Sequence, residues 1–381
     1  MTMVKALAIV VALGLALGRP LPAAAITIDT QARHALIVDF ETGATLLEKE
    51  ADVLMPPSSM SKIMTAYMIF DAIKKGRLKL DDEVPVSEKA WRMGGSKMFV
   101  QVGSRVKVED LIRGIIVQSG NDACVVMAEA LAGSEAAFAE QMTQRARELG
   151  LTRSTFRNAS GWPEEGHLMT ARDLAILARR LIIDFPEHYH YYAQKEFTFN
   201  GIKQGNRNPL LYKDGGGDGL KTGHTEAAGY GLTASAKRGE RRLIMVVNGL
   251  PSIRARIAES ERLMDWAFRE FDNVRLFKRG EVVEQAEVWL GEKPTVPLTV
   301  AEDLVVTMPR AARKDMKVTL SYTAPLPAPV VAGAPVGRIV IDLPDQAPRQ
   351  IPVVAGGDVS ELGVVGRVAS AVGYLLWGSK K

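Results

Sequence analysis

The stretch PPSSMSKIMTA, residues 56–66, places a serine three residues before a lysine, and the rest of the chain is interpreted around it. Prolines favour the start of a helix, and residues 63–73 contain few helix breakers, so we expect a helix whose first turn holds Ser59. Positions i and i+3 share a helical face, which would bring the Lys62 amine beside the Ser59 hydroxyl. A partly desolvated lysine can lose its proton and accept one from serine, so the pair has the chemistry of a nucleophile and its base.

The Ser-x-x-Lys spacing is weak by itself, because residues 104–107 also fit it and a polar surface turn explains most such matches. Two further elements accompany Ser59 and Lys62. Ser119-Gly120-Asn121 interrupts two helical runs, where a hydroxyl and a carboxamide can project into a cleft. Lys221-Thr222-Gly223 begins a predicted strand, and Gly223 would leave room for a substrate backbone alongside it. Taken singly, these triplets are also typical of a capped helix end and of an exposed strand residue.

The length and composition predict a globular protein of two domains with appendages. The chain has 381 residues, 47% of them apolar, and a net charge of +4, which is too balanced to indicate a nucleic-acid partner. Residues 1–25 combine a charged start at Lys5, an apolar run and small residues at 23–25, and predict an export signal rather than a membrane-spanning helix. Cys124 is the sole cysteine, which excludes an internal disulfide, and its apolar surroundings predict a buried thiol.

Periodicity divides the mature chain at about residue 272. Residues 26–272 predict a hairpin at 34–50, then helices, then strands, and finally a helix at 253–271. This order favours an α+β fold in which an antiparallel sheet is flanked by helices. Residues 273–356 contain short alternating runs separated by Gly and Pro, which predict a small all-β domain without chemistry of its own. The predicted helices are 108–117, 121–131, 134–149 and 170–183, and the strands are 196–199, 219–223, 229–237 and 242–248.

The three motifs together resemble the set found in β-lactamases and penicillin-binding proteins, in the same order and with similar spacing. Three longer stretches, RGIIVQSGNDAC at 113–124, KEFTFNG at 195–201 and DGLKTGHT at 218–225, resemble the low-molecular-mass penicillin-binding proteins that act as D-alanyl-D-alanine carboxypeptidases. The resemblance covers essentially the whole mature chain. It implies a serine enzyme that removes the terminal D-alanine from peptidoglycan stem pentapeptides through an acyl-enzyme and that β-lactams acylate.

The resemblance also implies roles for individual residues. Ser59 would be the nucleophile and Lys62 its base, while Ser119 and Lys221 would relay a proton to the leaving amine. The positive Lys221 would help to keep Lys62 neutral. Backbone amides of Ser59 and of the strand that carries Lys221 would hold the oxyanion, and Asn121 would hold the substrate amide.

The substrate ends in a carboxylate, which requires hydrogen-bond donors. The resemblance assigns Thr222 and His224 to this carboxylate, and Arg207 falls where the family places an arginine, although a lone arginine is more often part of a surface ion pair. We expect no cofactor and no metal, since the five histidines are scattered and the pair His188 and His190 lies in a tyrosine-rich stretch typical of packing.

Two alternatives remain open from the sequence. A β-lactamase shares the nucleophile, and class A enzymes use a glutamate for deacylation. Glu164 and Glu165 fall in the corresponding region, but the surrounding GWPEEGH lacks that family's pattern, and a β domain with a tail is foreign to it. A non-catalytic cell-wall-binding protein of the same fold is the other alternative, against which the intact motifs argue.

The tail, residues 357–381, predicts an amphipathic helix. Apolar residues of 361–377 recur at helical spacing, and the run is shorter than the ~20 residues that a spanning helix requires. Trp377, Lys380 and Lys381 suit a lipid head-group region. We therefore expect an anchor that lies in the outer surface of a bacterial cytoplasmic membrane, on the periplasmic side; a helix docked on the β domain is the alternative.

Overall fold

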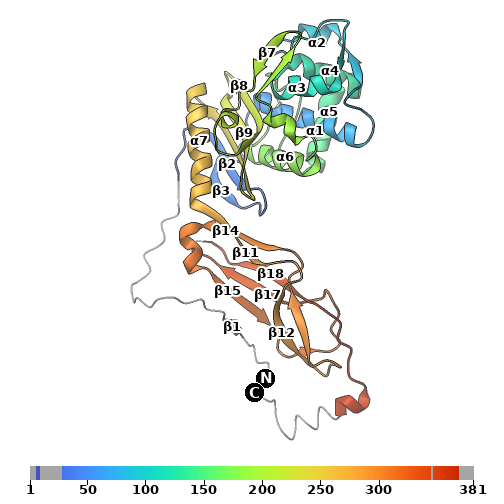
Figure 1. Cartoon of the computed structure of the whole chain (residues 1–381), viewed down its shortest axis with the longest axis vertical. Coiled ribbons are helices and arrows are strands. Elements are labelled where there is room, and N and C mark those ends of the chain that lie inside the picture. The colour runs from blue at the N-terminus through green and yellow to red at the C-terminus, as the bar shows by residue number, and fades with distance from the viewer. Residues whose placement is uncertain (1–5, 9–27, 345, 369–381) are drawn as a thin grey trace. The chain divides into compact units, whose positions relative to one another are not determined.

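The computed structural model describes residues 6–8, 28–344 and 346–368. The chain forms two compact units, which are considered separately. Of the described residues, the mixed unit comprises 28–269, and the strand unit comprises those from 270 onward together with 6–8. Figure 1 shows helices and strands in the mixed unit, drawn from blue to yellow, and mainly strands in the orange and red part of the chain. The expected α+β fold with a following all-β domain is therefore confirmed.

The mixed unit is built on a five-stranded antiparallel sheet with the order β3-β2-β10-β9-β8. The predicted hairpin is present as β2 (His34–Asp39) and β3 (Thr45–Lys49), and β8 (Gly217–Thr225), β9 (Gly229–Arg238) and β10 (Arg241–Leu250) contain the three predicted strands. Because β2 pairs with β10, the start and the end of this unit are held together in one sheet.

Helices cover both faces of this sheet, with α7 on one side and the remaining long helices on the other (Figure 1). Side chains cap two of them as predicted: Ser134 accepts from the Ala137 amide and Thr170 from the Asp173 amide. The other elements of the unit are η1 Ser58–Ser61, α1 Lys62–Lys74, β4 Glu83–Pro85, α2 Glu88–Arg92, β5 Arg105–Lys107, α3 Val108–Ile116, α4 Asn121–Ala132, α5 Glu135–Glu148, α6 Ala171–Asp184, η2 Tyr189–Ala193, β6 Glu196–Phe199, β7 Ile202–Gly205, η3 Pro209–Tyr212 and α7 Ile253–Glu270.

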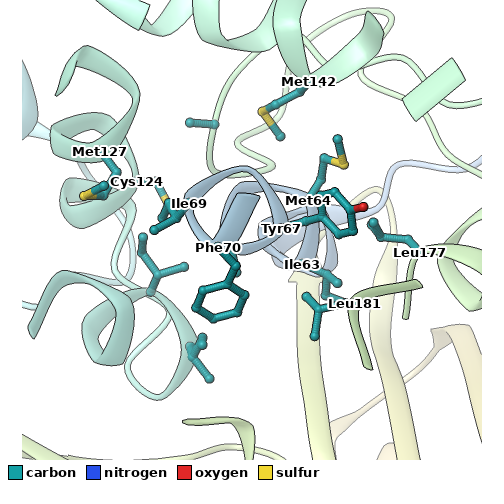
Figure 2. Packing of buried hydrophobic residues seen from close by; sticks show 14 of the residues in the cluster. Ile63, Met64, Tyr67, Ile69, Phe70, Cys124, Met127, Met142, Leu177 and Leu181 are labelled. Carbon is teal, nitrogen blue, oxygen red and sulfur yellow. The ribbon is translucent and has the colours of Figure 1, made fainter. Parts of the chain in front are cut away.

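Helix α1 runs through the centre of the hydrophobic core and is buried on nearly every side. Figure 2 shows Cys124 and Met127 of α4 beside Ile69, while Leu177 and Leu181 of α6 lie near Ile63. A helix enclosed in this way holds its first turn rigidly, because movement would open cavities in a close-packed interior. The Cys124 thiol is fully buried, as predicted, and burial raises its pKa to about 12.

The strand unit has its own hydrophobic core, formed by alternating inward residues such as Val296, Leu298, Ile339 and Ile341. Its larger sheet has the order β1-β15-β17-β18-β13-β12-β16, and β11 pairs with β14 in a second sheet. The strands are β1 Ala6–Ala8, β11 Phe271–Phe277, β12 Val282–Trp289, β13 Thr295–Thr299, β14 Leu304–Pro309, β15 Lys317–Tyr322, β16 Leu326–Pro327, β17 Pro335–Asp342 and β18 Arg349–Ala355, with a 3₁₀ helix η4 at Arg310–Asp315.

The predicted export signal and tail lie largely outside the described residues. Of the signal, residues 6–8 are described, as β1 beside β15. Of the tail, residues 364–368 are helical, and residues 369–381 lie beyond the described part. Among the residues that the structure describes, no helix has both the length and the apolar character needed to cross a membrane.

Candidate active site

The Lys62 amine is the centre of the candidate site. It is buried, with a residue exposure of 1%, and its Nζ lies 2.8 Å from Ser59 Oγ, 2.7 Å from Asn121 Oδ1 and 2.6 Å from the Ser160 carbonyl oxygen. Ser59 is half-buried, so its hydroxyl lies between solvent and the enclosed amine. Residues from the first two sequence motifs therefore meet at one nitrogen.

These contacts define how a neutral Lys62 would use its hydrogens. The Ser160 carbonyl can only accept, and Asn121 presents Oδ1 to Lys62 because its Nδ2 donates to the Gly94 carbonyl. A neutral amine has two N–H groups and one lone pair. Both N–H groups are used by the two carbonyl oxygens, which leaves the lone pair for the Ser59 hydroxyl proton. The arrangement can therefore deprotonate Ser59.

Burial is the main reason why Lys62 can be neutral near physiological pH. Loss of solvation lowers its pKa from the usual 10.5 to about 8, and the positive charge of Arg207 contributes, while Cys124 and Asp122 act in the opposite direction. We expected partial desolvation of Lys62, with help from the positive charge of Lys221. Desolvation is the largest cause of the lowered pKa, because the amine is enclosed by protein on all sides.

Ser59 lies in the 3₁₀ helix η1, and the α-helix begins only at Lys62. We expected a helix whose first turn holds Ser59, and this first turn is a 3₁₀ helix that leads directly into α1. A 3₁₀ helix has three residues per turn, so side chains at i and i+3 are eclipsed and Ser59 still faces Lys62. The residue before it, Ser58, has φ of 51°, a conformation that non-glycine residues rarely adopt.

Two glycines allow other segments to approach this turn closely. A Cβ on Gly161, whose φ is +75°, would lie 1.9 Å from the Ser58 carbonyl oxygen, and a Cβ on Gly223 would lie 2.9 Å from that of Pro57. The side-chain face of Gly223 is therefore occupied by the turn itself, and the expectation that a substrate backbone lies alongside this glycine stays a prediction. Lys221-Thr222-Gly223 also lies in the middle of β8 rather than at its start.

Ser119 and Asn121 flank the start of α4. Ser119 has φ of 62°, is buried, and its Oγ has no hydrogen-bond partner among the described residues. Strained conformations of this kind are concentrated at functional sites. The neighbouring Asp122 carboxylate accepts from the amides of Met98 at 2.9 Å and Phe99 at 2.8 Å, which fixes the preceding loop beside the site.

Lys221 and Thr222 are both buried on β8. Desolvation lowers the pKa of Lys221 well below its usual value, and Lys62 and Arg207 add to the effect. Its Nζ donates to the Thr222 carbonyl at 3.2 Å and pairs with no carboxylate in the described chain. A buried amine without a counter-ion provides a place for a ligand carboxylate.

Arg207 and His224 lie at the exposed side of the same region. Arg207 donates to Ser96 Oγ at 2.8 Å, and His224 stacks on Tyr230 with 3.9 Å between ring centroids. Sequence reasoning missed Arg256 of α7, whose guanidinium lies over the Tyr230 ring and whose Nε is buried without a partner in the described chain. It also missed the Ser160 carbonyl, since a backbone acceptor carries no sequence signal. Arg256 is one of several arginines on α7, so only the folded structure shows that this one lies at the site.

Within the residues that the structure describes, no three histidine, cysteine, aspartate or glutamate side chains are grouped as metal ligands. His188, one of the paired histidines, stacks on Phe70 at 4.9 Å between ring centroids, which is the packing role that the sequence predicts.

Comparison with known proteins identifies the family. Residues 22–252 match the family model of D-alanyl-D-alanine carboxypeptidases, and residues 271–361 match that of the C-terminal domain of penicillin-binding protein 5. D-alanyl-D-alanine carboxypeptidase DacC of Escherichia coli is 42% identical over 89% of this chain and 87% of its own length.

Solved structures agree with these matches. Penicillin-binding protein 5 of Haemophilus influenzae is 35% identical, with a TM-score of 0.80 over 88% of this chain and 99% of its own. Penicillin-binding protein D2 of Listeria monocytogenes, solved with ampicillin bound, is 31% identical, with a TM-score of 0.59 over 64% of this chain and 99% of its own. The site formed by Ser59 and the buried Lys62 thus stands in a chain that belongs to the D-alanyl-D-alanine carboxypeptidase family of penicillin-binding proteins.

Proposed function

We propose that this chain removes the terminal D-alanine from peptidoglycan stem pentapeptides, with Ser59 as nucleophile and Lys62 as general base. The observation that carries the proposal is the 2.8 Å contact between Ser59 Oγ and a buried Lys62 Nζ whose other two contacts are obligate acceptors. The neutral amine takes the Ser59 proton as Oγ attacks the carbonyl between the two D-alanines. Collapse of the tetrahedral intermediate breaks the peptide bond and leaves the substrate acyl group on Ser59.

The proton then passes to the leaving amine through Ser119, whose buried Oγ is free of other partners in the described chain. Water hydrolyses the ester and restores Ser59. The amides of Ser59 and of β8 stabilise the oxyanion, and Asn121 orients the substrate amide. β-Lactams acylate the same serine, and no metal or cofactor takes part.

The substrate carboxylate binds the cationic side of the site. Lys221, Thr222 and Arg207 provide donors, with His224 at its edge, and Gly223 lets β8 approach the Ser59 turn. Arg256 adds a fourth cationic or donor group, since its Nε lacks a partner within the described residues. A free C-terminus is thereby distinguished from a continuing peptide chain, which is the requirement for a carboxypeptidase.

Release of D-alanine from a stem pentapeptide tests this proposal. Ser59→Ala is expected to abolish release, whereas Ser104→Ala, in the other Ser-x-x-Lys of the chain, keeps the wild-type rate. Retained release by Ser59→Ala, with loss in Ser104→Ala, would transfer the nucleophile to the second motif and contradict the proposal.

Export and membrane attachment complete the proposed function. Residues 1–25 direct secretion and are removed, and residues 357–381 attach the mature enzyme to the periplasmic face of the cytoplasmic membrane. Support comes from the start of the tail, where Val364, Val365 and Val368 are 69%, 84% and 60% exposed. Apolar side chains left in solvent suit insertion between lipid head groups.

Membrane fractionation tests the attachment. Full-length protein is expected in the membrane fraction, and a chain that ends at Ala355 is expected in the soluble fraction with unchanged D-alanine release. Equal membrane association of both forms would remove the tail from this role.

A further inference from the structure

Glu135 is a buried acidic residue that has no part in the roles proposed above. It is the first residue of α5, directly after the capping Ser134, and it is 8% exposed. An acidic side chain in the first turn of a helix interacts favourably with the helix dipole, but an exposed side chain would do so equally well. Burial of a charged group is costly unless specific partners compensate for it. The partners of Glu135 therefore indicate what it does.

The two carboxylate oxygens of Glu135 contact different parts of the mixed unit. Oε2 lies 2.9 Å from Nζ of Lys89 in α2, and Oε1 accepts from the Ala159 amide at 3.2 Å. The Lys89 side chain is 55% exposed, so solvent screens this ion pair and it contributes little to stability. The bond to the Ala159 amide is buried, and it joins α5 to the segment that supplies the Ser160 carbonyl to Lys62.

Three consecutive peptide units of this segment, residues 158–161, are each held by a side chain. Glu135 accepts from the amide of the first unit, and Thr65 Oγ1 donates to the carbonyl of the second at 2.5 Å. Asn158 Oδ1 accepts from the amide of the third at 2.9 Å. The third unit contains the Ser160 carbonyl. Its direction therefore depends on a turn of which Glu135 fixes the first peptide unit.

We propose that Glu135 is a positioning residue that directs the Ser160 carbonyl at the Lys62 amine. Without Glu135 the Ala159 amide is a buried donor that lacks an acceptor, and the segment shifts to find one. The Ser160 carbonyl then moves away from Lys62 Nζ, whose lone pair is no longer held toward Ser59 Oγ. The inference rests on the proposed carboxypeptidase function, and it adds a residue outside the site on which the base depends.

The pH dependence of penicillin acylation in the full-length protein tests this role. Glu135→Ala is expected to lower the acylation rate constant at high pH about tenfold, with no change in the dissociation constant of penicillin. The midpoint of the pH profile is expected to move to lower pH. A carbonyl oxygen stabilises an ammonium more than a neutral amine, so its departure lowers the pKa of Lys62. Loss of folded enzyme alone would reduce the rate and leave the midpoint in place.

Two further variants separate the hydrogen bond from the charge. Glu135→Gln removes the negative charge and keeps the Oε1 acceptor, so its rate constant should stay within about threefold of the wild-type value, with the same midpoint. Glu140→Ala is the matched control, because this residue is an exposed glutamate on the same helix, and its profile should equal that of the wild-type protein. The charged and titratable groups that act on Lys62 are the same in every variant; they are Arg207, Asp122, Cys124 and Lys221.

Thermal unfolding shows whether each variant is folded at the assay temperature. If Glu135→Ala does not fold, Glu135→Asp takes its place with the same expectation, since the shorter side chain keeps the charge and no longer reaches the Ala159 amide. An unchanged profile, or a lower rate with an unmoved midpoint, would overturn the inference. Equal loss in Glu135→Gln and Glu135→Ala would overturn it as well. Absence of acylation in the wild-type protein would instead contradict the proposed function itself.

Discussion

The two units of this chain differ in what they bury. The mixed unit encloses ionisable side chains, among them Lys62, Asp122, His167 and Lys221. In the described part of the strand unit, the buried polar side chains are Thr299 and Thr307. Burying a charge without a partner costs several kcal/mol, so an interior that retains two lysines indicates a function that needs them. The described interior of the strand unit is thus almost wholly apolar.

The largest expected effect comes from Lys62→Arg. Arginine keeps the charge and remains protonated at any working pH, so it cannot accept the Ser59 proton. We expect penicillin acylation to fall about 10³- to 10⁴-fold, within the range attributed to a general base. Stopped-flow acylation measures this, with Arg338→Lys on the strand unit as a control that leaves the rate unchanged. An acylation rate within tenfold of wild type would mean that another group serves as base.

Lys221→Met should affect catalysis and stability differently. Lys221 is the cation that we propose binds the substrate carboxylate, and its removal is expected to lower kcat/KM by about 10²- to 10³-fold. Thermal unfolding at pH 7 should give a melting temperature no lower than that of the wild-type protein. A lysine whose pKa is lowered by burial penalises the folded state while it is protonated, and this penalty disappears as pH rises toward the ordinary value of 10.5.

The stability gain of Lys221→Met should therefore shrink at higher pH. Lys317→Met in the strand unit is the matched control. Lys317 is exposed, so this variant should keep the activity and the stability of the wild-type protein. A large loss of stability in Lys221→Met would show that the buried amine supports the fold.

Ile339→Ala is expected to lower stability without changing acylation, which is the reverse of the effect expected for Lys221→Met. The side chain is fully buried in the core of that unit, and its truncation is expected to cost about 2–5 kcal/mol of unfolding free energy. Denaturant unfolding should reveal this loss, whereas the penicillin acylation rate of the mixed unit should stay the same. The adjacent Arg338→Ala, at an exposed position, should affect neither. Loss of acylation at a temperature where the mixed unit remains folded would contradict the separation of roles.

The sequence predicted local relationships in the site better than long-range ones. The contact between Ser59 and Lys62 follows from a three-residue spacing that is satisfied by an α-helix and by the 3₁₀ helix that forms instead. The acceptor at Ser160 is a backbone atom 98 positions away from Lys62, and every residue has such an atom. Arg256 likewise reaches the site only because α7 covers the sheet. The motif residues could be identified from their side-chain types and spacing. The Ser160 carbonyl and Arg256 reach the site only through tertiary packing.

The pH dependence of acylation is the smallest of the expected effects and addresses Lys62 alone. Its pKa is lowered to about 8, so the neutral fraction rises as pH increases through that value. Acylation should increase about tenfold per unit up to pH 8 and then level off. A rate independent of pH between 6 and 9 would argue against lysine as the base.

The central claim is that Ser59, activated by a buried lysine, forms the acyl-enzyme. Mass spectrometry of the full-length protein after incubation with benzylpenicillin tests it most directly. The account predicts one adduct of the mass of the intact antibiotic, located by peptide mapping on Ser59, and no adduct in Ser59→Ala. An adduct on Ser58, Ser61, Ser104 or Ser119, or undiminished labelling of Ser59→Ala, would contradict it.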